Sequence, residues 1–352
     1  MQTAIKTNLY SLTFSELQQN LVSAGLPSFR AQQVWQGMYQ QLWSTWEQFT
    51  TLSKDLRAQL NAAFTLHEIF PTKTIESKDK LTQKILFSLA DGRAVEAVLM
   101  RYEQRNTICI STQVGCAMNC SFCATGQMGF FRNLTAGEIV QQVLFFARQL
   151  KNEGDQLTNI VYMGMGEPFH NYAVTIKSID ILNDHSGFDF GERRFTISTV
   201  GMVPEIEKFT QEDRQVNLAI SLHAANDDLR NTMLPINRKY PIRQLMKACR
   251  DYTTATRRRI TFEYALIDGV NDTEEHAREL AGLLKGMLCH VNLIPLNSTR
   301  GSKLRGSVED SASAFMQVLT DRHIPCSMRL RRGMEIAAGC GQLATEAKEN
   351  KG

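Results

Sequence analysis

Residues 107–123 read TICISTQVGCAMNCSFC, a short apolar run that continues directly into three closely spaced cysteines. The run Thr107 to Thr112 has the length and composition of a buried strand. Downstream of it, short apolar runs alternate with stretches of helical periodicity, which is typical of repeated βα units around a parallel sheet. The sequence therefore predicts an α/β fold.

Further apolar runs are expected to form the other strands of this sheet: Asn159 to Met163, Arg194 to Thr199, Val216 to Leu222, Ile260 to Leu266 and His290 to Pro295. A seventh strand, Pro325 to Leu330, is expected after a helix from Asp310 to Thr320. The other expected helices are Ala136 to Leu150, Tyr172 to Asn183, Pro241 to Ala255 and Thr273 to Lys285. Right-handed crossovers would wind these units into a barrel or part of one, with its site at the carboxyl ends of the strands.

The N-terminal part of the chain has a different pattern. Three stretches begin with a serine suited to N-capping and carry apolar residues at helical spacing: Ser15 to Val22, Ser28 to Gln41 and Ser53 to Ala63. Lys84 to Leu89 and Ala94 to Arg101 predict a β-hairpin. We therefore divide the chain into a helical accessory domain (1–68), a linker with a hairpin (69–101), an α/β core (102–335) and a C-terminal tail (336–352).

Composition narrows the class of protein. The 352 residues are 43% hydrophobic, which suffices for a packed core and excludes a disordered, collagen-like or coiled-coil chain. The net charge of +3 neither requires nor forbids a nucleic-acid partner. The sequence has neither a membrane-length apolar run nor a signal peptide, so we expect a soluble, cytosolic protein. Eight cysteines in such a chain favour metal-binding or reactive thiols over a disulfide scaffold.

Three of these cysteines, Cys116, Cys120 and Cys123, form a Cys-x3-Cys-x2-Cys cluster. Closely spaced thiolates suit a soft metal ion or an iron–sulfur cluster. The sequence offers no fourth cysteine or histidine nearby, so one coordination position would stay open, as a reacting metal site requires. The alternatives are a zinc site completed by a distant residue and three structural thiols.

Polar residues follow the other predicted strands. Gly164-Met165-Gly166-Glu167-Pro168 ends the second strand, where glycines permit close backbone approach and a carboxylate could bind an ammonium group. Ser198, Ser221-Leu222-His223 and Asn297 end later strands and could hydrogen-bond a ribose or an adenine. Each feature alone also fits an ordinary strand-to-helix connection or a satisfied structural group.

A further thiol stands near the C terminus, in Gly339-Cys340-Gly341-Gln342. Glycines on both sides give an open backbone, which favours a reactive thiol over a packed structural one. Cys109, seven residues before the cluster, is a possible partner for it. Cys249, Cys289 and Cys326 lie in apolar contexts and are interpreted as structural.

Taken together, these motifs resemble the RlmN/Cfr family of radical S-adenosylmethionine RNA methyltransferases over almost the whole chain. Besides the segments above, the resemblance rests on Phe29-Arg30-Ala31, Gln113-Val114-Gly115-Cys116, Arg132-Asn133-Leu134-Thr135, Ser221-Leu222-His223-Ala224, Pro235-Ile236-Asn237, Gly269-Val270-Asn271-Asp272 and Cys340-Gly341-Gln342-Leu343. It implies a partial (β/α)6 TIM-type barrel with a helix-hairpin-helix-like, RNA-binding accessory domain.

The resemblance also implies roles for particular residues. Cys116, Cys120 and Cys123 would bind a [4Fe-4S] cluster. Contacts with S-adenosylmethionine would come from Gly166, Glu167, Ser198, Ser221, Leu222, His223 and Asn297. Cys340 would carry the methyl group, Cys109 would resolve the covalent intermediate, and Glu96 would accept a proton.

The implied reaction is methylation of adenine C2 in 23S rRNA and in some tRNAs, with two molecules of S-adenosylmethionine per turnover. The implied partners are those RNAs and an electron donor such as flavodoxin or ferredoxin, acting on a monomer. Arg257 to Arg259, Arg329 and Arg331-Arg332 could hold phosphates or simply form a solvated face. Two alternatives stay open: methylation at C8, and a zinc-dependent RNA-binding module without enzymatic activity.

Overall fold

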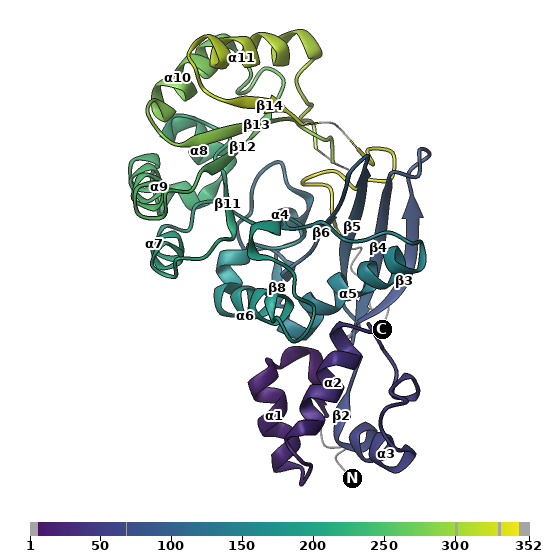
Figure 1. The fold of residues 1–352 in the computed structure, drawn as a ribbon. Helices are drawn as coiled ribbons and strands as arrows, with labels where there is room; N and C mark the ends of the chain where they lie inside the picture. Colours follow the sequence, from purple (N-terminus) through teal and green to yellow (C-terminus); the bar gives the residue numbers. More distant parts are fainter. Residues whose placement is uncertain (1–5, 68, 300–301, 330–331, 345–352) are drawn as a thin grey trace.

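A ten-stranded sheet forms the centre of the computed structural model, which describes residues 6–67, 69–299, 302–329 and 332–344 (Figure 1). In the described part of the chain, seven of its strands pair in parallel, in the order β6, β9, β10, β11, β12, β13, β14. These strands span Arg105–Cys109, Asn159–Tyr162, Phe195–Thr199, Asn217–Ser221, Ile260–Leu266, Cys289–Pro295 and Cys326–Met328. The predicted α/β fold is confirmed, including its seventh strand.

Helices connect these strands and cover the outside of the curved sheet (Figure 1). They are α5 (Ala136–Asn152), α6 (Tyr172–Asn183), α7 (Val203–Gln211), α8 (Asp227–Met233), α9 (Ile242–Thr256), α10 (Glu274–Leu284) and α11 (Glu309–Asp321), with short 3-10 turns at Pro168–Asn171, Glu192–Arg194 and Pro235–Arg238. The longest, α5, begins at a capping box in which the side chains of Thr135 and Glu138 bond each other's backbone N–H groups. All connections run from one parallel strand to the next, so the carboxyl ends of the strands share one rim.

The predicted hairpin consists of β4 (Thr82–Leu89) and β5 (Ala94–Tyr102). It continues the central sheet, because β5 pairs antiparallel with β6. A third antiparallel strand, β3 (Ile69–Glu76), forms the outer edge and was not predicted. Most of its residues are exposed, and the pairing with β4 is interrupted at Pro71 and Lys73, so β3 lacks the apolar alternation by which a strand is recognised.

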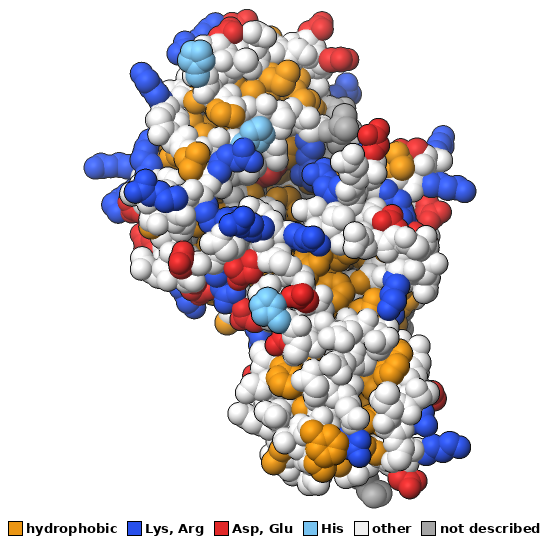
Figure 2. Space-filling model, viewed as in Figure 1, with side chains coloured by type: hydrophobic (Ala, Val, Ile, Leu, Met, Phe, Trp, Pro, Cys, Tyr) orange, Lys and Arg blue, Asp and Glu red, His pale blue; other side chains and the backbone are white. Residues whose placement is uncertain are grey.

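The N-terminal helices α1 (Phe14–Ser23), α2 (Phe29–Tyr39) and α3 (Lys54–Ala63) form a separate layer at one end of the molecule, which stands out as a lobe in the space-filling view (Figure 1, Figure 2). They are accompanied by 3-10 turns at Leu9–Ser11 and Trp46–Gln48 and by the short pair β1 (Thr7–Asn8) and β2 (Phe64–Thr65). The Trp35 Nε1–H donates to Asp184 Oδ1 at 3.1 Å and so joins this layer to the α/β core.

The predicted serine caps are only partly correct. Ser53 caps α3 by accepting a hydrogen bond from Leu56 N. Helix α1 instead begins after Thr13, which forms a capping box with Glu16 and leaves Ser15 inside the helix. Ser28 precedes α2 but makes no side-chain cap bond. Across the described residues, no helix combines the length and the hydropathy that a membrane span requires.

Candidate active site

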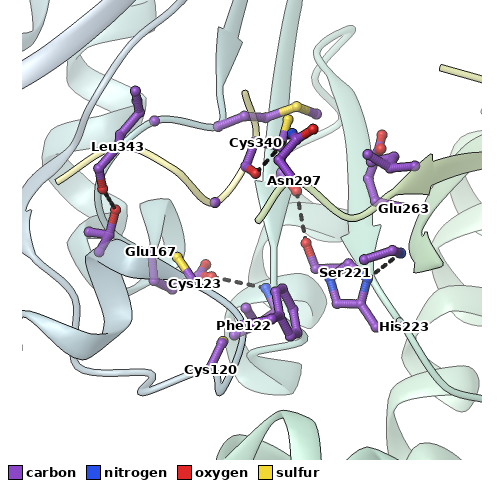
Figure 3. A pocket seen from close by; sticks show the side chains of 18 of the residues that line it. Cys120, Phe122, Cys123, Glu167, Ser221, His223, Glu263, Asn297, Cys340 and Leu343 are labelled. Atoms are coloured by element: carbon purple, nitrogen blue, oxygen red, sulfur yellow. Dashed lines mark hydrogen bonds between the residues drawn. The ribbon is translucent and has the colours of Figure 1, made fainter. Parts of the chain in front are cut away.

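A cavity opens at the carboxyl ends of the parallel strands, where the sequence predicts the site (Figure 3). We call it the carboxyl-end cavity. The structure brings nine of the predicted residues to its lining: Cys120, Cys123, Gly166, Glu167, Ser198, Ser221, His223, Asn297 and Cys340. Leu222 is fully buried behind the wall, where its N–H donates to Glu263 O and its carbonyl accepts from Arg230 Nε.

The cysteine loop is held by a small ribbon of β7 (Gln113–Gly115) and β8 (Phe130–Asn133), with helix α4 (Ala124–Gln127) between them. Gly115 has φ +73°, and a side chain there would collide with the carbonyl oxygen of Gly129, so only glycine fits. Cys116 N donates to that same carbonyl at 2.9 Å. These constraints fix the start of the loop beside the sheet.

Burial strongly disfavours the ionised form of the cluster cysteines. It raises the pKa of Cys116 to about 12, and the pKa values of Cys120 and Cys123 are also raised, first by burial and then by neighbouring charges. Three adjacent buried thiols would therefore stay protonated on their own. A cationic metal centre would compensate for burial and hold them as thiolates.

The thiol arrangement also bears on the kind of metal centre. Among the described residues, no three His, Cys, Asp or Glu side chains are grouped as ligands of one ion. A structural zinc ion draws four ligands onto one atom, whereas a [4Fe-4S] cluster takes each thiolate on a different iron and so tolerates wider separation. Three cysteine thiolates are the ligand number of a site with one open position, so the donor set of Cys116, Cys120 and Cys123 fits a cluster.

Glu167 lines the same cavity as Cys120 and Cys123 and is almost completely buried. Its Oε1 accepts from Phe169 N at 3.0 Å, and its Oε2 accepts from Val200 N at 2.9 Å. Burial raises the pKa of Glu167 to about 7, although these two hydrogen bonds act in the opposite direction and lower it. A ligand's ammonium group would favour its ionised form, so Glu167 is well suited to bind one.

Gly166 lets the backbone before Glu167 pack closely against β7, and this places the Glu167 carboxylate at the cavity. Its φ is +103°, and a Cβ there would lie 2.6 Å from Cβ of Gln113. The Gln113 side chain in turn accepts from Glu167 N at 2.8 Å. The backbone therefore passes close to β7 only because position 166 has no side chain.

His223 presents a hydrogen-bond donor to the same cavity. Its Nδ1 accepts from Ala265 N at 2.9 Å, so in the neutral ring the proton resides on Nε2. Burial lowers the pKa of His223 to about 3, which keeps the ring neutral. The edge of the ring packs against Phe122, at 4.9 Å between centroids.

The tail reaches the cavity through backbone contacts. Ala124 N donates to Gly341 O at 2.8 Å, and Thr125 Oγ1 donates to Leu343 O at 2.5 Å. On the other side, Lys84 Nζ donates to Ala337 O at 3.1 Å. The partly buried Cys340 is thereby held between the cysteine loop and the hairpin, facing both the cavity and β6.

Cys109 and Glu96 lie on the hairpin side of the tail. Cys109, at the end of β6, lines a smaller cavity together with Cys340, and both are free thiols. Burial, and then the charge of Cys340, raises the pKa of Cys109 to about 12. Glu96 accepts from Ala344 N at 3.1 Å and pairs with Lys84 Nζ at 2.9 Å. Burial raises the pKa of Glu96, while Lys84 opposes this shift.

Sequence reasoning missed Arg230, which is fully buried beneath the cavity. Its guanidinium donates to Leu222 O, Val200 O and Asn237 Oδ1, at 3.1, 2.6 and 2.8 Å. It therefore ties together the loops after β10 and β11. A lone arginine in a short polar helix gives no signal of burial in one sequence.

Comparisons with known proteins agree with this geometry. The model of the radical SAM superfamily matches residues 110–281, and that of the ribosomal RNA large subunit methyltransferase N-terminal domain matches residues 7–66. A probable dual-specificity RNA methyltransferase RlmN of Caldanaerobacter subterraneus is 46% identical over 96% of this chain and 97% of its own. Dual-specificity RNA methyltransferase RlmN 1 of Myxococcus xanthus is 45% identical, over 97% and 96%.

A solved structure gives the same result. The crystal structure of a radical SAM methyltransferase from Sphaerobacter thermophilus superposes with a TM-score of 0.94 and 50% identity, covering 96% of this chain and 99% of that one. Radical SAM enzymes use a [4Fe-4S] cluster and S-adenosylmethionine, so the predicted cofactors are confirmed. This chain is an enzyme that belongs to the RlmN family of radical SAM RNA methyltransferases.

Proposed function

We propose that this enzyme methylates C2 of an adenine in 23S rRNA and, as a second substrate, in tRNA. The names of its relatives, which are RNA methyltransferases, support RNA as the substrate class. The observation that carries the proposal is that Cys340 lines one cavity together with Cys120, Cys123 and Glu167. A thiol in that position lies next to both cofactors.

The cofactor contacts are assigned from the cavity lining, except that Cys116 is assigned from its place in the cysteine loop and Leu222 from its place behind the wall. Cys116, Cys120 and Cys123 hold the cluster. Glu167 binds the ammonium group of S-adenosylmethionine beside Gly166, and His223 donates through Nε2 to an acceptor on its nucleoside. Ser198, Ser221 and Asn297 complete the polar wall, and Leu222 supports it from behind.

Bound cluster and S-adenosylmethionine supply the methyl group and the radical that activates it on sulfur. Such chemistry suits adenine C2, which lies between two ring nitrogens and is too electron-poor to attack an electrophilic methyl group. The thiol of Cys340 would be methylated first and lose its proton, and the methyl carbon, after losing one hydrogen atom, would then bond to C2 of the RNA. Glu96 would take the C2 proton, and the odd electron would return to the bound cluster. The Cys109 thiolate would then attack the sulfur of Cys340 and break its bond to the methylene carbon, which takes up a proton to become the methyl group. This step releases the methylated RNA and leaves a Cys109–Cys340 disulfide.

The position of Cys109 supports its role, whereas Glu96 lies beside the tail, outside the lining of both cavities. Cys109 shares a cavity with Cys340, and Glu96 contacts the tail backbone four residues beyond it. The high pKa of Cys109 means that it needs a base or a nearby cation to become a thiolate. Arg329 lines the same cavity and supplies such a positive charge.

The remaining assignments follow from an RNA substrate. Residues 1–68 would form the RNA-gripping domain, 69–101 the hairpin linker, 102–335 the catalytic core and 336–352 the tail. Arg257 and Arg259 are exposed and available for phosphates, whereas Arg258 bonds Gln215 and Asn217. Flavodoxin or ferredoxin would reduce the cluster of a monomeric enzyme in the cytoplasm, where its RNA substrates are.

The test is anaerobic reconstitution with iron and sulfide, followed by S-adenosylmethionine, a reductant and a protein-free 23S rRNA fragment. Nucleoside mass spectrometry should find 2-methyladenosine with wild type and with the control Cys326→Ala, and none with Cys340→Ala. Cys326 is a partly buried thiol on β14, outside the lining of the carboxyl-end cavity. Detection of 8-methyladenosine would instead establish the C8 activity, and absence of any methylated adenosine would refute the proposal.

A further inference from the structure

A third, more polar cavity of about 430 Å³ occupies the barrel interior towards the amino ends of the strands. We call it the amino-end cavity. Its volume is that of a small-molecule site, and polar side chains from several strands line it: Thr107, Asn159, Thr196, Thr261, Asn292 and Ser327. Met163, Glu263 and Arg329 line both this cavity and the carboxyl-end cavity, so they lie where the two meet. None of these three has a role in the cofactor site above.

Glu263 stands in the middle of β12 with one carboxylate oxygen fixed by its neighbours. Asn292, its register partner on β13, donates from Nδ2 to Oε1 at 3.0 Å. The orientation of that amide is set in turn by Ser327 Oγ, which donates to Asn292 Oδ1 at 3.1 Å. Oε1 is therefore held by a chain of side chains across three adjacent strands.

The other oxygen, Oε2, is buried and has no hydrogen-bond partner within the described residues. Arg329 Nη1 lies 3.9 Å away, which is an ion pair but too long for a hydrogen bond. Glu263 is only 4% exposed, and burial raises its pKa against the opposing charge of Arg329. A buried carboxylate oxygen without a donor is costly, so we look for a ligand that brings one.

Arg329 connects this carboxylate to the reacting thiols. Both Cys340 and Glu263 raise the pKa of Arg329 by their negative charge, Cys340 most, and Cys109 adds to the effect. Figure 3 shows Cys340 and Asn297 between Glu167 on one side and Glu263 on the other. Arg329 lines the smaller cavity together with Cys340 and lies 3.9 Å from Glu263 Oε2, so the order is a thiol, then a cationic donor, then an unpartnered acceptor.

An adenine presents the matching order along one edge. C2 is followed by the acceptor N1 and then by the exocyclic N6 amino group, which is a donor. With C2 at Cys340, N1 would face Arg329 and the amino group would face Glu263 Oε2. A guanine reverses the last two groups, because it has a donor at N1 and an acceptor at O6.

We propose that Glu263 and Arg329 read the target base, with Glu263 Oε2 accepting from the N6 amino group and Arg329 donating to the adjacent ring nitrogen. This inference rests on the proposed function and deepens it by assigning base specificity to the centre of the barrel. Asn292 acts as a positioning residue, since it holds the other carboxylate oxygen. The methylated base is thus selected from the side opposite the cofactors.

The variant Glu263→Gln makes a sharp test because the structure dictates its amide orientation. Asn292 donates to the Oε1 position, so the glutamine oxygen belongs there and its NH2 group takes the Oε2 position. An acceptor becomes a donor at the point where the base is read. This change should disfavour adenosine and favour inosine, whose O6 is an acceptor.

The experiment uses full-length reconstituted enzyme and synthetic RNA with adenosine, purine riboside or inosine at the target position. For wild type, loss of the N6 amino group should lower kcat/KM roughly 10- to 100-fold and weaken RNA binding similarly, the usual effect of one hydrogen bond to a charged group. C2 of purine riboside is at least as electron-poor as C2 of adenine. A slower reaction of purine riboside therefore reflects weaker recognition of the base and not a less reactive carbon. In Glu263→Gln the difference in kcat/KM between adenosine and purine riboside should shrink to less than about 3-fold. The ratio of kcat/KM for inosine to kcat/KM for adenosine should rise about 10-fold or more.

Glu76→Gln, an exposed change on β3, serves as the matched control and should keep the wild-type ratios. Cluster absorbance and thermal unfolding check that both variants are folded. Equal rates and affinities for adenosine and purine riboside in wild type would overturn the inference while leaving the proposed function intact. That comparison needs no variant, so it decides the matter even if Glu263→Gln fails to fold. No methylation of adenosine at all would refute the proposed function itself.

Discussion

Replacing His223 by asparagine should change how the stability of the cofactor-free protein depends on pH. His223 has φ +60°, a left-handed conformation that asparagine adopts more readily than most residues. An asparagine oxygen also retains an acceptor for Ala265 N, which donates to the wild-type ring. The substitution therefore removes the titrating ring and keeps the local backbone.

The magnitude follows from the pKa. Burial lowers the pKa of His223 from 6.5 to about 3, so below about pH 6.5 the unfolded chain binds a proton that the folded chain does not. The stability that the neutral ring contributes is complete above pH 6.5 and is lost as the pH falls. Between about pH 7.5 and pH 5, linkage gives a loss of about 2 kcal/mol in wild type. Any packing cost of asparagine is the same at both pH values and cancels from the comparison.

Urea unfolding of both proteins at these two pH values measures the difference directly. The stability advantage of wild type over His223→Asn should fall by about 2 kcal/mol on acidification. The matched control is His323→Asn, since His323 is exposed and has φ +58°; it should show no such change. A pH-independent difference for His223→Asn, or one that grows at acidic pH, would refute the assignment of a buried neutral ring.

Three further changes test the site. Cys109→Ala should accumulate a covalent RNA–protein adduct on denaturing gels, because the second thiol that releases Cys340 is missing; adduct-free turnover would contradict this role. Gly166→Ala should weaken S-adenosylmethionine binding in equilibrium dialysis and lower stability by roughly 1–3 kcal/mol, since a Cβ would meet Gln113 at 2.6 Å and φ is +103°; wild-type affinity would argue against the close approach. Arg230→Met should destabilise the protein by about 3 kcal/mol in urea unfolding, because buried carbonyl groups lose their hydrogen-bond donor. An effect below about 0.5 kcal/mol would show that these carbonyls find other donors.

Much of the α/β core was predictable because its strands are short, largely apolar runs of the expected length. Buried residues alternate with partly buried ones in β9, β10 and β13, and helix α6 was predicted at its observed ends, Tyr172–Asn183. Strand β3 was missed because exposed residues dominate its edge position. The short ribbon of β7 and β8 was also missed, because three- and four-residue strands are too short for periodicity.

The site residues were predictable where spacing or glycine context marked them, as for Cys116, Cys120, Cys123 and Cys340. Arg230, Glu263 and Arg329 were not identified as a group, because their importance depends on burial and on contacts between distant strands. In the sequence, Glu263 is only one polar residue within a predicted strand. Only the register of β12, β13 and β14 shows that its neighbours fix one oxygen and leave the other free.

The attachment of the tail by peptide groups has a consequence for its evolution. Four of its anchoring contacts use the carbonyls of Ala337, Gly341 and Leu343 and the N–H of Ala344, which do not depend on side-chain identity. Related enzymes can therefore diverge in sequence here while the thiol keeps its position. Gly339 is an exception, because any side chain there would collide with Asn297. Ala338 and Leu343 are also buried, and the Gln342 side chain accepts from Gly339 N and donates to Ser298 O, so only part of the tail can vary without loss of contacts.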